Sequence, residues 1–284
     1  MTRYLITGAA GMLGRDLQTV LDGRDVTALG RADLDVTDLD AVRSAVGNHD
    51  VVINAAAYTK VDDAESHEDD AFAVNAVGAK NLALAAAHIG ARLVQVSTDY
   101  VFDGTATSPY DEKTPLNPVS AYGRTKAEGE RLAFEANPHA TYVVRTAWLY
   151  GEHGPNFAKT MLRLAASHPE VTVVTDQVGQ PTWTMDLAKQ IVALADSAAP
   201  AGVYHGTNAG QASWFDFARA VFASAGLDPE RVKPTDSSAF VRPAPRPAYS
   251  VLGHDGWAQA GLQPMRPWQD ALAEAAATGA VATS

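Results

Sequence analysis

Residues 4–17, YLITGAAGMLGRDL, place an apolar strand directly before three glycines and an amphipathic helix. Gly8 allows a tight turn, Gly11 lets the backbone approach a pyrophosphate, and Gly14 lets the helix pack close to the strand. The start of the helix offers free N–H groups and a positive dipole end to phosphates. A glycine triplet alone also fits a structural strand–helix turn, but on the first strand of an alternating chain it predicts a dinucleotide site.

The first half of the chain alternates between β-branched apolar runs and helical patterns. The strand-like runs are RYLIT (3–7), VTAL (26–29), DVVIN (50–54), RLVQVS (92–97) and TYVVRT (141–146). Helical spacing recurs over 12–22, 38–46, 66–89 and 119–136. Such alternation predicts right-handed βαβ units and therefore an α/β fold with a Rossmann-like, doubly wound parallel sheet.

After about residue 150 the alternation gives way to segments dense in glycine and proline, such as DQVGQPTW and PAPRPAYS. Helical patterns remain at 156–167, 184–196 and 213–225, and an alanine-rich tail follows. We therefore expect an NAD(P)-binding Rossmann domain over 1–150. Residues 151–284 should form mainly a smaller substrate-binding lobe, with some segments returning to the Rossmann sheet.

The composition argues against several classes of partner. Asp and Glu outnumber Lys and Arg by 33 to 22, the net charge is −11, and no basic run offsets it, so we expect neither nucleic-acid nor membrane binding. The absence of cysteine excludes disulfides and thiolate chemistry, and the eight histidines lack ligand spacing, so no metal is expected. The chain enters a strand almost at once and has no apolar run of about 20 residues, which favours a cytoplasmic protein.

The end of the second strand bears on the choice of cofactor. Dinucleotide folds that prefer NAD usually carry an acid there to bind the ribose 2′-hydroxyl, whereas this chain has Gly30 and Arg31. An arginine can pair with a 2′-phosphate, so we expect NADPH, with NADH as the second choice and a solvent-facing arginine as the structural alternative. Asp35 either accepts from the adenine amino group or begins a turn or caps the helix at 38–46.

The stretch SAYGRTKAEGE, residues 120–130, places Tyr122 and Lys126 on one face of a helix. By itself this spacing is typical of a solvated helix face. Thr98, however, lies at the carboxyl end of a strand, where open α/β folds bind ligands. Hydride transfer to a ketone leaves an oxyanion that must be stabilised and protonated. We therefore expect Tyr122 to donate the proton, Lys126 to lower the pKa of the phenol, and Thr98 to complete the donor pair.

The motifs TGAAGMLG, NAAAYTKVDDAE, VSTDYVFDG, SAYGRTKAEGE, VVRTAWLYG, DQVGQPT and RPAYS together resemble the dTDP-4-dehydrorhamnose reductase family of the extended short-chain dehydrogenase/reductase superfamily. The resemblance covers the chain to about residue 270. It implies reduction of the 4-keto group of dTDP-4-dehydro-L-rhamnose to dTDP-L-rhamnose with NAD(P)H. Cofactor contacts implied by it are Gly11, Met12, Leu13, Asp35, Val36, Ala57, Tyr58 and Thr59, besides Tyr122 and Lys126. The sugar contacts it implies are Thr98, Asp99 and Trp148.

The structural alternative for Trp148 is a plain core residue. The two substrate phosphates need local cations, and the candidates are Lys159, Arg163, Arg242 and, foremost, Arg246 in RPAYS. Met185 stands where some relatives have a glutamate that helps to hold a magnesium-bridged dimer. We therefore expect a monomer or homodimer without that metal.

Two other functions remain open from the sequence. A reductase of a related dTDP-4-keto-6-deoxysugar in an antibiotic pathway would share every motif, and a nucleotide-binding regulatory subunit would share the fold. The Thr98, Tyr122 and Lys126 set disfavours the regulatory subunit. A dehydratase is disfavoured because Tyr100, and not a second acid, follows Asp99.

Overall fold

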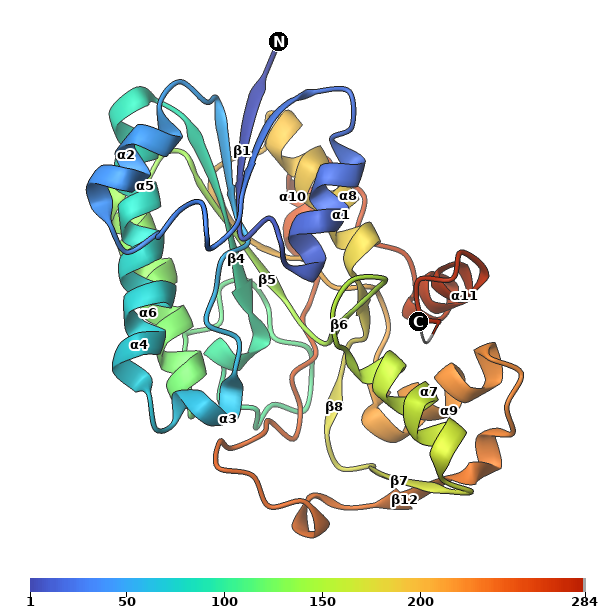
Figure 1. Ribbon diagram of the computed structural model, residues 1–284. Coiled ribbons are helices and arrows are strands. Elements are labelled where there is room, and N and C mark those ends of the chain that lie inside the picture. Colours follow the sequence, from blue (N-terminus) through green and yellow to red (C-terminus); the bar gives the residue numbers. More distant parts are fainter. Residues whose placement is uncertain (283–284) are drawn as a thin grey trace.

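Six parallel strands form the central sheet of the computed structural model, which describes residues 1–282 (Figure 1). Their order across the sheet is β2-β1-β3-β4-β5-β10. The strands are β1 (Arg3–Thr7), β2 (Asp25–Leu29), β3 (Val51–Asn54), β4 (Arg92–Thr98), β5 (Thr141–Thr146) and β10 (Gly202–His205). The five strands expected from the sequence and the doubly wound α/β class are confirmed. The sixth strand comes from the second half of the chain.

The strand order reverses beside β1. The chain passes from β1 to β2 on one side, then crosses back to place β3 on the other side of β1. The connections at the carboxyl ends of β1 and β3 therefore diverge. In open parallel sheets this divergence leaves a crevice where ligands bind.

Helices cover both faces of the sheet because alternate strand residues point to opposite sides. Tyr4 and Ile6 pack in one cluster under α1 (Met12–Val20), α8 (Thr184–Asp196) and α10 (Asp255–Gln259). Leu5 packs in the opposite cluster under α2 (Leu39–Val46), α5 (Gly78–Ile89) and α6 (Ala121–Ala136). Figure 1 shows these two helical layers on either side of the sheet.

The helix expected over 66–89 is interrupted by a wider turn. It consists of α4 (Glu68–Phe72), a π-helical turn (Ala73–Val77) and α5, and the short α3 (Val61–Ala64) precedes it. Asn75 in the π-helical turn accepts a hydrogen bond from the Tyr58 N–H at 2.8 Å and donates to the Tyr58 carbonyl at 3.2 Å. The turn thus fixes the loop that follows β3.

A second hydrophobic cluster joins the elements of the second half of the chain. Its helices are α7 (Phe157–Ser167), α9 (Trp214–Ser224) and α11 (Trp268–Ala277). Three two-stranded sheets accompany them: β6 (Leu149–Tyr150) with β9 (Thr182–Trp183), β7 (Val171–Val174) with β12 (Val232–Thr235), and β8 (Val178–Gly179) with β11 (Ala212–Ser213). The helices expected at 156–167, 184–196 and 213–225 are all present.

Two segments from the second half of the chain pack with the central sheet and its helices. Helix α8 packs on α1, and β10 pairs with β5. The division into domains at residue 150 stays a prediction. Within residues 1–282, none of the helices has the length and apolar character needed to span a membrane.

Candidate active site

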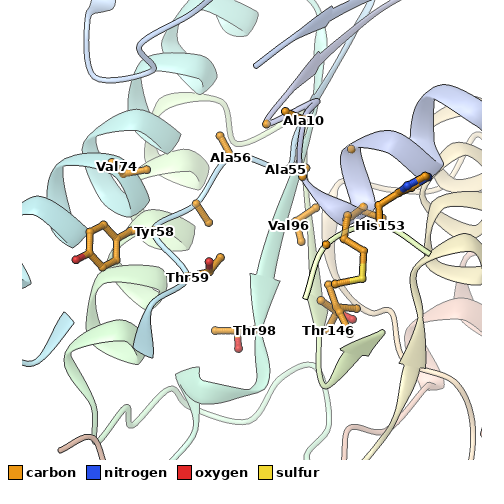
Figure 2. Close-up of a pocket in the computed structure, with 18 of the residues that line it drawn as sticks. Ala10, Ala55, Ala56, Tyr58, Thr59, Val74, Val96, Thr98, Thr146 and His153 are labelled. Atoms are coloured by element: carbon orange, nitrogen blue, oxygen red, sulfur yellow. The ribbon is translucent and has the colours of Figure 1, made fainter. Parts of the chain in front are cut away.

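A cavity of about 1700 Å³ opens at the carboxyl ends of β1, β3, β4 and β5. Figure 2 shows it with Ala10 and Ala55 at one end and Thr98 and Thr146 at the other. Most residues singled out in the sequence lie on its walls: Gly8, Gly11, Met12, Leu13, Gly14, Arg31, Asp35, Val36, Ala57, Tyr58, Thr59, Thr98, Asp99, Tyr122, Lys126 and Trp148. Arg246 is not among the residues that line it.

The glycine turn forms one end of the cavity. Gly8 has a φ of +70°, and a Cβ on it would lie 2.6 Å from the Ala55 carbonyl. A Cβ on Gly14 would lie 2.3 Å from the Gly8 carbonyl oxygen, so this glycine permits the close packing of α1 on β1. Gly11 is the N-cap of α1 and provides no side-chain cap, which leaves the first N–H groups of the helix for a ligand. These features fit a dinucleotide pyrophosphate.

The residues after β2 form the next part of the wall. Arg31 and Arg15 both line the cavity. Asp35 accepts hydrogen bonds from the N–H and hydroxyl of Thr37 at 2.9 and 2.7 Å, and the N–H bond lowers its pKa. Asp38, and not Asp35, caps α2, so the capping interpretation of Asp35 is wrong. Asp35 forms a turn and also borders the cavity.

The loop after β3 places Ala57, Tyr58 and Thr59 on the cavity wall. The Tyr58 hydroxyl donates a hydrogen bond to Asp63, and this bond raises the pKa of the phenol to about 12. In Figure 2 the Tyr58 ring points away from Thr98. Tyr58 therefore lines the cavity while its hydroxyl is bound to Asp63.

Helix α6 brings Tyr122 and Lys126 to the strand ends. Its N-cap, Ser120, accepts a hydrogen bond from the Gly123 N–H at 3.1 Å. A Cβ on Gly123 would lie 2.2 Å from the Tyr100 carbonyl oxygen, so the missing side chain lets the helix pack closely on the end of β4. The Lys126 ammonium donates to the Val96 carbonyl at 2.6 Å. The structure therefore brings Thr98, Tyr122 and Lys126 to one cavity.

The electrostatics of this group differ from the expectation that Lys126 acidifies Tyr122. Burial raises the pKa of Tyr122 to about 12; Thr98 opposes this effect, and the charge of Asp99 adds to it. Burial lowers the pKa of Lys126 to about 8, against the charge of Glu130. Because the Lys126 ammonium is bound to a backbone carbonyl, desolvation is the largest influence on the pKa of the Tyr122 phenol. Tyr122 is consequently held in the protonated form that a proton donor needs.

A buried carboxyl group and a second threonine lie beside Thr98. Asp99 is 2% exposed, its Oδ1 accepts from the Thr98 hydroxyl at 3.0 Å, and its Oδ2 has no hydrogen-bond partner. Thr146 pairs with Thr98 in the β4–β5 register, lines the cavity and has an unpartnered hydroxyl. Thr146 was not among the site residues predicted from the sequence. A signal was present, because β4 and β5 both end in threonine and their carboxyl ends are adjacent.

The pKa of Asp99 leads to a prediction about stability. Burial raises it from 3.8 to about 6, so between these values the folded protein binds a proton that the unfolded chain releases. Wild-type stability therefore falls as the pH rises through this window, by about 2–3 kcal/mol at roughly 1.4 kcal/mol for each pKa unit. Asp99→Asn cannot ionise and should be the more stable protein at pH 8, with the gain vanishing near pH 4. Urea unfolding at both pH values measures this; a wild type that is no less stable than the variant at pH 8 contradicts it.

Trp148 follows β5 and reaches the cavity in a half-buried position, not as a fully enclosed core residue. Its φ of 47° places it in the left-handed region, and no other non-glycine residue within 1–282 has a positive φ. Its indole stacks on that of Trp214, with centroids 3.6 Å apart and planes at 8°.

The cations expected at the substrate phosphates are dispersed. Arg246 forms an ion pair with Asp62 at 2.8 Å. Lys159 lines the cavity, and its ammonium donates to the Glu152 carbonyl. Arg163 and Arg242 are exposed and lie outside the cavity wall. The role of Arg246 in substrate binding stays a prediction.

Met185 is half-buried and packs against the second hydrophobic cluster. Across the part of the chain that the structure describes, no three His, Asp or Glu side chains gather closely enough to hold a metal ion.

Comparison with known proteins gives a consistent result. The family model described as "RmlD substrate binding domain" matches residues 2–280. The chain is 53% identical over 280 residues to the dTDP-4-dehydrorhamnose reductase of Streptomyces griseus, covering 96% of this chain and 92% of the relative. It is 50% identical over 277 residues to the dTDP-4-keto-6-deoxy-D-glucose reductase of Streptomyces niveus, covering 96% of each. The crystal structure of dTDP-4-dehydrorhamnose reductase from Bacillus anthracis in complex with NADP matches with a TM-score of 0.93 and 39% identity, over 97% of this chain and 99% of that one.

Proposed function

Since the chain belongs to the RmlD substrate binding domain family, we propose that it is an NAD(P)H-dependent reductase of the 4-keto group of dTDP-4-dehydro-L-rhamnose, with dTDP-L-rhamnose as the product. One observation carries the proposal. The glycine turn and the Thr98, Tyr122 and Lys126 side chains line the same cavity. A nucleotide and a carbonyl compound bound there together would meet at the proton donor.

A bound reduced nicotinamide would supply the hydride. The residues of the chain would stabilise and protonate the oxyanion that results. Hydride addition leaves an alkoxide, which is a much stronger base than a phenolate. Tyr122, with a pKa of about 12, gives up its proton to such an oxyanion downhill. The Thr98 hydroxyl donates to Asp99 in this structure, and it would become a second donor to the same oxygen by turning its proton from that carboxylate. The Lys126 ammonium, fixed on the Val96 carbonyl, adds a positive charge to the wall of the same cavity.

The test of this function is a spectrophotometric assay at 340 nm with purified protein, NADPH or NADH, and dTDP-4-dehydro-L-rhamnose. Oxidation of the cofactor coupled to formation of dTDP-L-rhamnose, identified by NMR, supports the proposal. A protein that leaves both cofactors unoxidised in the presence of this ketone contradicts it.

A second substrate is favoured by the similarity to the Streptomyces niveus reductase, whose name specifies dTDP-4-keto-6-deoxy-D-glucose. The two ketones differ in configuration on the hexose ring, and both carry the same nucleotide and the same reacting carbonyl. The assay therefore includes both ketones at equal concentration. The larger kcat/KM identifies the substrate, because discrimination depends on transition-state binding.

We propose that NADPH is the preferred cofactor. Arg31 and Arg15 line the cavity after β2 and β1, and no acidic residue stands at position 30 to bind a ribose 2′-hydroxyl. Guanidinium groups form strong charge-assisted hydrogen bonds with phosphate. A cytoplasmic location and a monomeric or homodimeric state stay predictions.

The change Arg31→Ala tests this preference. Because charged hydrogen bonds contribute about 1.5–3 kcal/mol, we expect the KM for NADPH to rise about 10- to 100-fold while the KM for NADH changes little. Arg43→Ala, on exposed α2, serves as the control and should alter neither constant. Equal losses with both cofactors would show that Arg31 does not contact the 2′-phosphate.

A further inference from the structure

Trp148 stands in a backbone conformation that an L residue avoids, and it does so on the wall of the cavity. Strained residues persist only where the surroundings hold them, and they gather at functional sites. The surroundings of Trp148 can be named. On one side Thr146 ends β5, and on the other β6 pairs with β9, while the Trp148 carbonyl accepts a hydrogen bond from the Thr182 N–H at 3.2 Å.

The indole ring is held by a second set of contacts. A Cβ on Gly179 would lie 2.6 Å from Cε2, 2.7 Å from Cζ2 and 2.9 Å from Nε1 of Trp148, so only glycine leaves room for the ring. The φ of Gly179 is not in the left-handed region, and the need for glycine is therefore steric.

Trp214 provides the stacking partner. The two indoles are nearly parallel, at 8°, with centroids 3.6 Å apart. Trp214 is itself fixed, because it is the first residue of α9 behind the Ser213–Asp216 capping box, and its ring packs on Phe157 at 4.5 Å. The β8–β11 pair also brings Gly179 close to the start of α9, because Gly179 lies opposite Ala212, two residues before Trp214.

We propose that Gly179 and Trp214 are positioning residues that hold the Trp148 indole as a rigid wall at the sugar end of the cavity. The wall stands two residues after Thr146, whose register partner is Thr98. A 6-deoxyhexose presents a methyl group and ring C–H groups, and an aromatic ring covers such apolar surface. Holding the indole in place thus fixes the orientation of the sugar and directs its carbonyl oxygen to the proton donor. This inference rests on the proposed function.

The experiment compares Gly179→Ala, Trp214→Ala and Trp214→Phe with wild type. Displacement of a positioning group by about 1 Å can cost about 100-fold in rate. We expect Gly179→Ala and Trp214→Ala to raise the KM for the keto-sugar about 10-fold or more and to lower kcat. The affinity for NADPH should be unchanged. Trp214→Phe keeps an aromatic stacking partner and should recover most of the loss.

Circular dichroism provides a readout that needs no turnover. Two indoles stacked at this distance should give an exciton couplet, which Gly179→Ala should weaken and Trp214→Ala should abolish. Gly202→Ala is the matched control, because a Cβ there meets no atom within 4 Å. Wild-type kinetic constants in Gly179→Ala and Trp214→Ala, with the couplet lost, would overturn the proposal. If Gly179→Ala does not fold, the two Trp214 variants decide by the same criterion.

The affinity for dTDP-L-rhamnose, measured by quenching of tryptophan fluorescence, separates this inference from the proposed function. A wild-type protein that reduces no keto-sugar would refute the function. Weaker binding of the product by Trp214→Ala, restored in Trp214→Phe, would still support the proposal that Trp214 positions the Trp148 indole. Equal binding of the product by all variants would refute that proposal.

Discussion

Tyr122→Phe should lower kcat/KM for the keto-sugar about 10²- to 10⁴-fold, the range that a general acid contributes. Phenylalanine keeps the ring that packs edge-on against Tyr100 at 5.6 Å and removes only the proton donor. The loss should therefore fall on the chemical step, with folding and NADPH affinity unchanged. Steady-state kinetics with both substrates and a fluorescence titration of NADPH measure these quantities.

Tyr204→Phe is the control for this experiment. Tyr204 lies in β10, and its hydroxyl donates to the Pro200 carbonyl at 2.6 Å, outside the cavity. Its loss should leave kcat unchanged. If Tyr122→Phe retained activity within tenfold of wild type, the proton would have to come from another group.

Arg145→Met should strongly lower the free energy of unfolding. Arg145 and Glu130 form a bidentate ion pair, at 3.0 Å from Nε to Oε1 and 2.7 Å from Nη2 to Oε2, and their side chains are 4% and 3% exposed. Removing one partner leaves a buried, unpaired charge, which costs about 3–5 kcal/mol. The free energy of unfolding in urea should fall by that amount.

Lys126 is the other cation that interacts with the charge of Glu130, but its ammonium is bound to the Val96 carbonyl. Ser97 donates to the Glu130 carboxylate at 2.5 Å, and His205, whose pKa is lowered to about 3 by burial and by Arg145, stays neutral. Arg131→Met is the matched control, because Arg131 pairs with Glu128 and Glu135 on the surface and should contribute less than about 1 kcal/mol. Equal costs for the two changes would refute the prediction.

The sequence predicted the sheet well because each strand and each covering helix is local. Five strands and seven helical regions fall where hydrophobic periodicity puts them. Strand β10 was not predicted because GVYH is only four residues long and has no distinctive hydrophobic pattern. Its place beside β5 also depends on contacts with a segment distant in the sequence. The π-helical turn was not predicted because one extra residue in a turn barely alters the hydrophobic periodicity of a helix.

The site was predictable to the extent that it depends on strand ends and on helix spacing. Thr98, Tyr122 and Lys126 meet because a parallel sheet puts its carboxyl ends on one edge, which the order of elements already implies. The pKa of Tyr122 was not predictable, since it depends on burial, on the hydroxyl of Thr98 and on the charge of Asp99. The stack of Trp148 on Trp214 joins residues 66 positions apart and leaves no local signal in the sequence.

The late arrival of β10 and α8 affects how the chain folds during synthesis. Until residues 184–205 have left the ribosome, the outer edge of β5 has no partner strand, and the side of α1 that packs on α8 is exposed to solvent. An open strand edge of this kind invites pairing with other nascent chains. Completion of the central sheet therefore waits for the second half of the polypeptide, and chaperone capture would act in that interval.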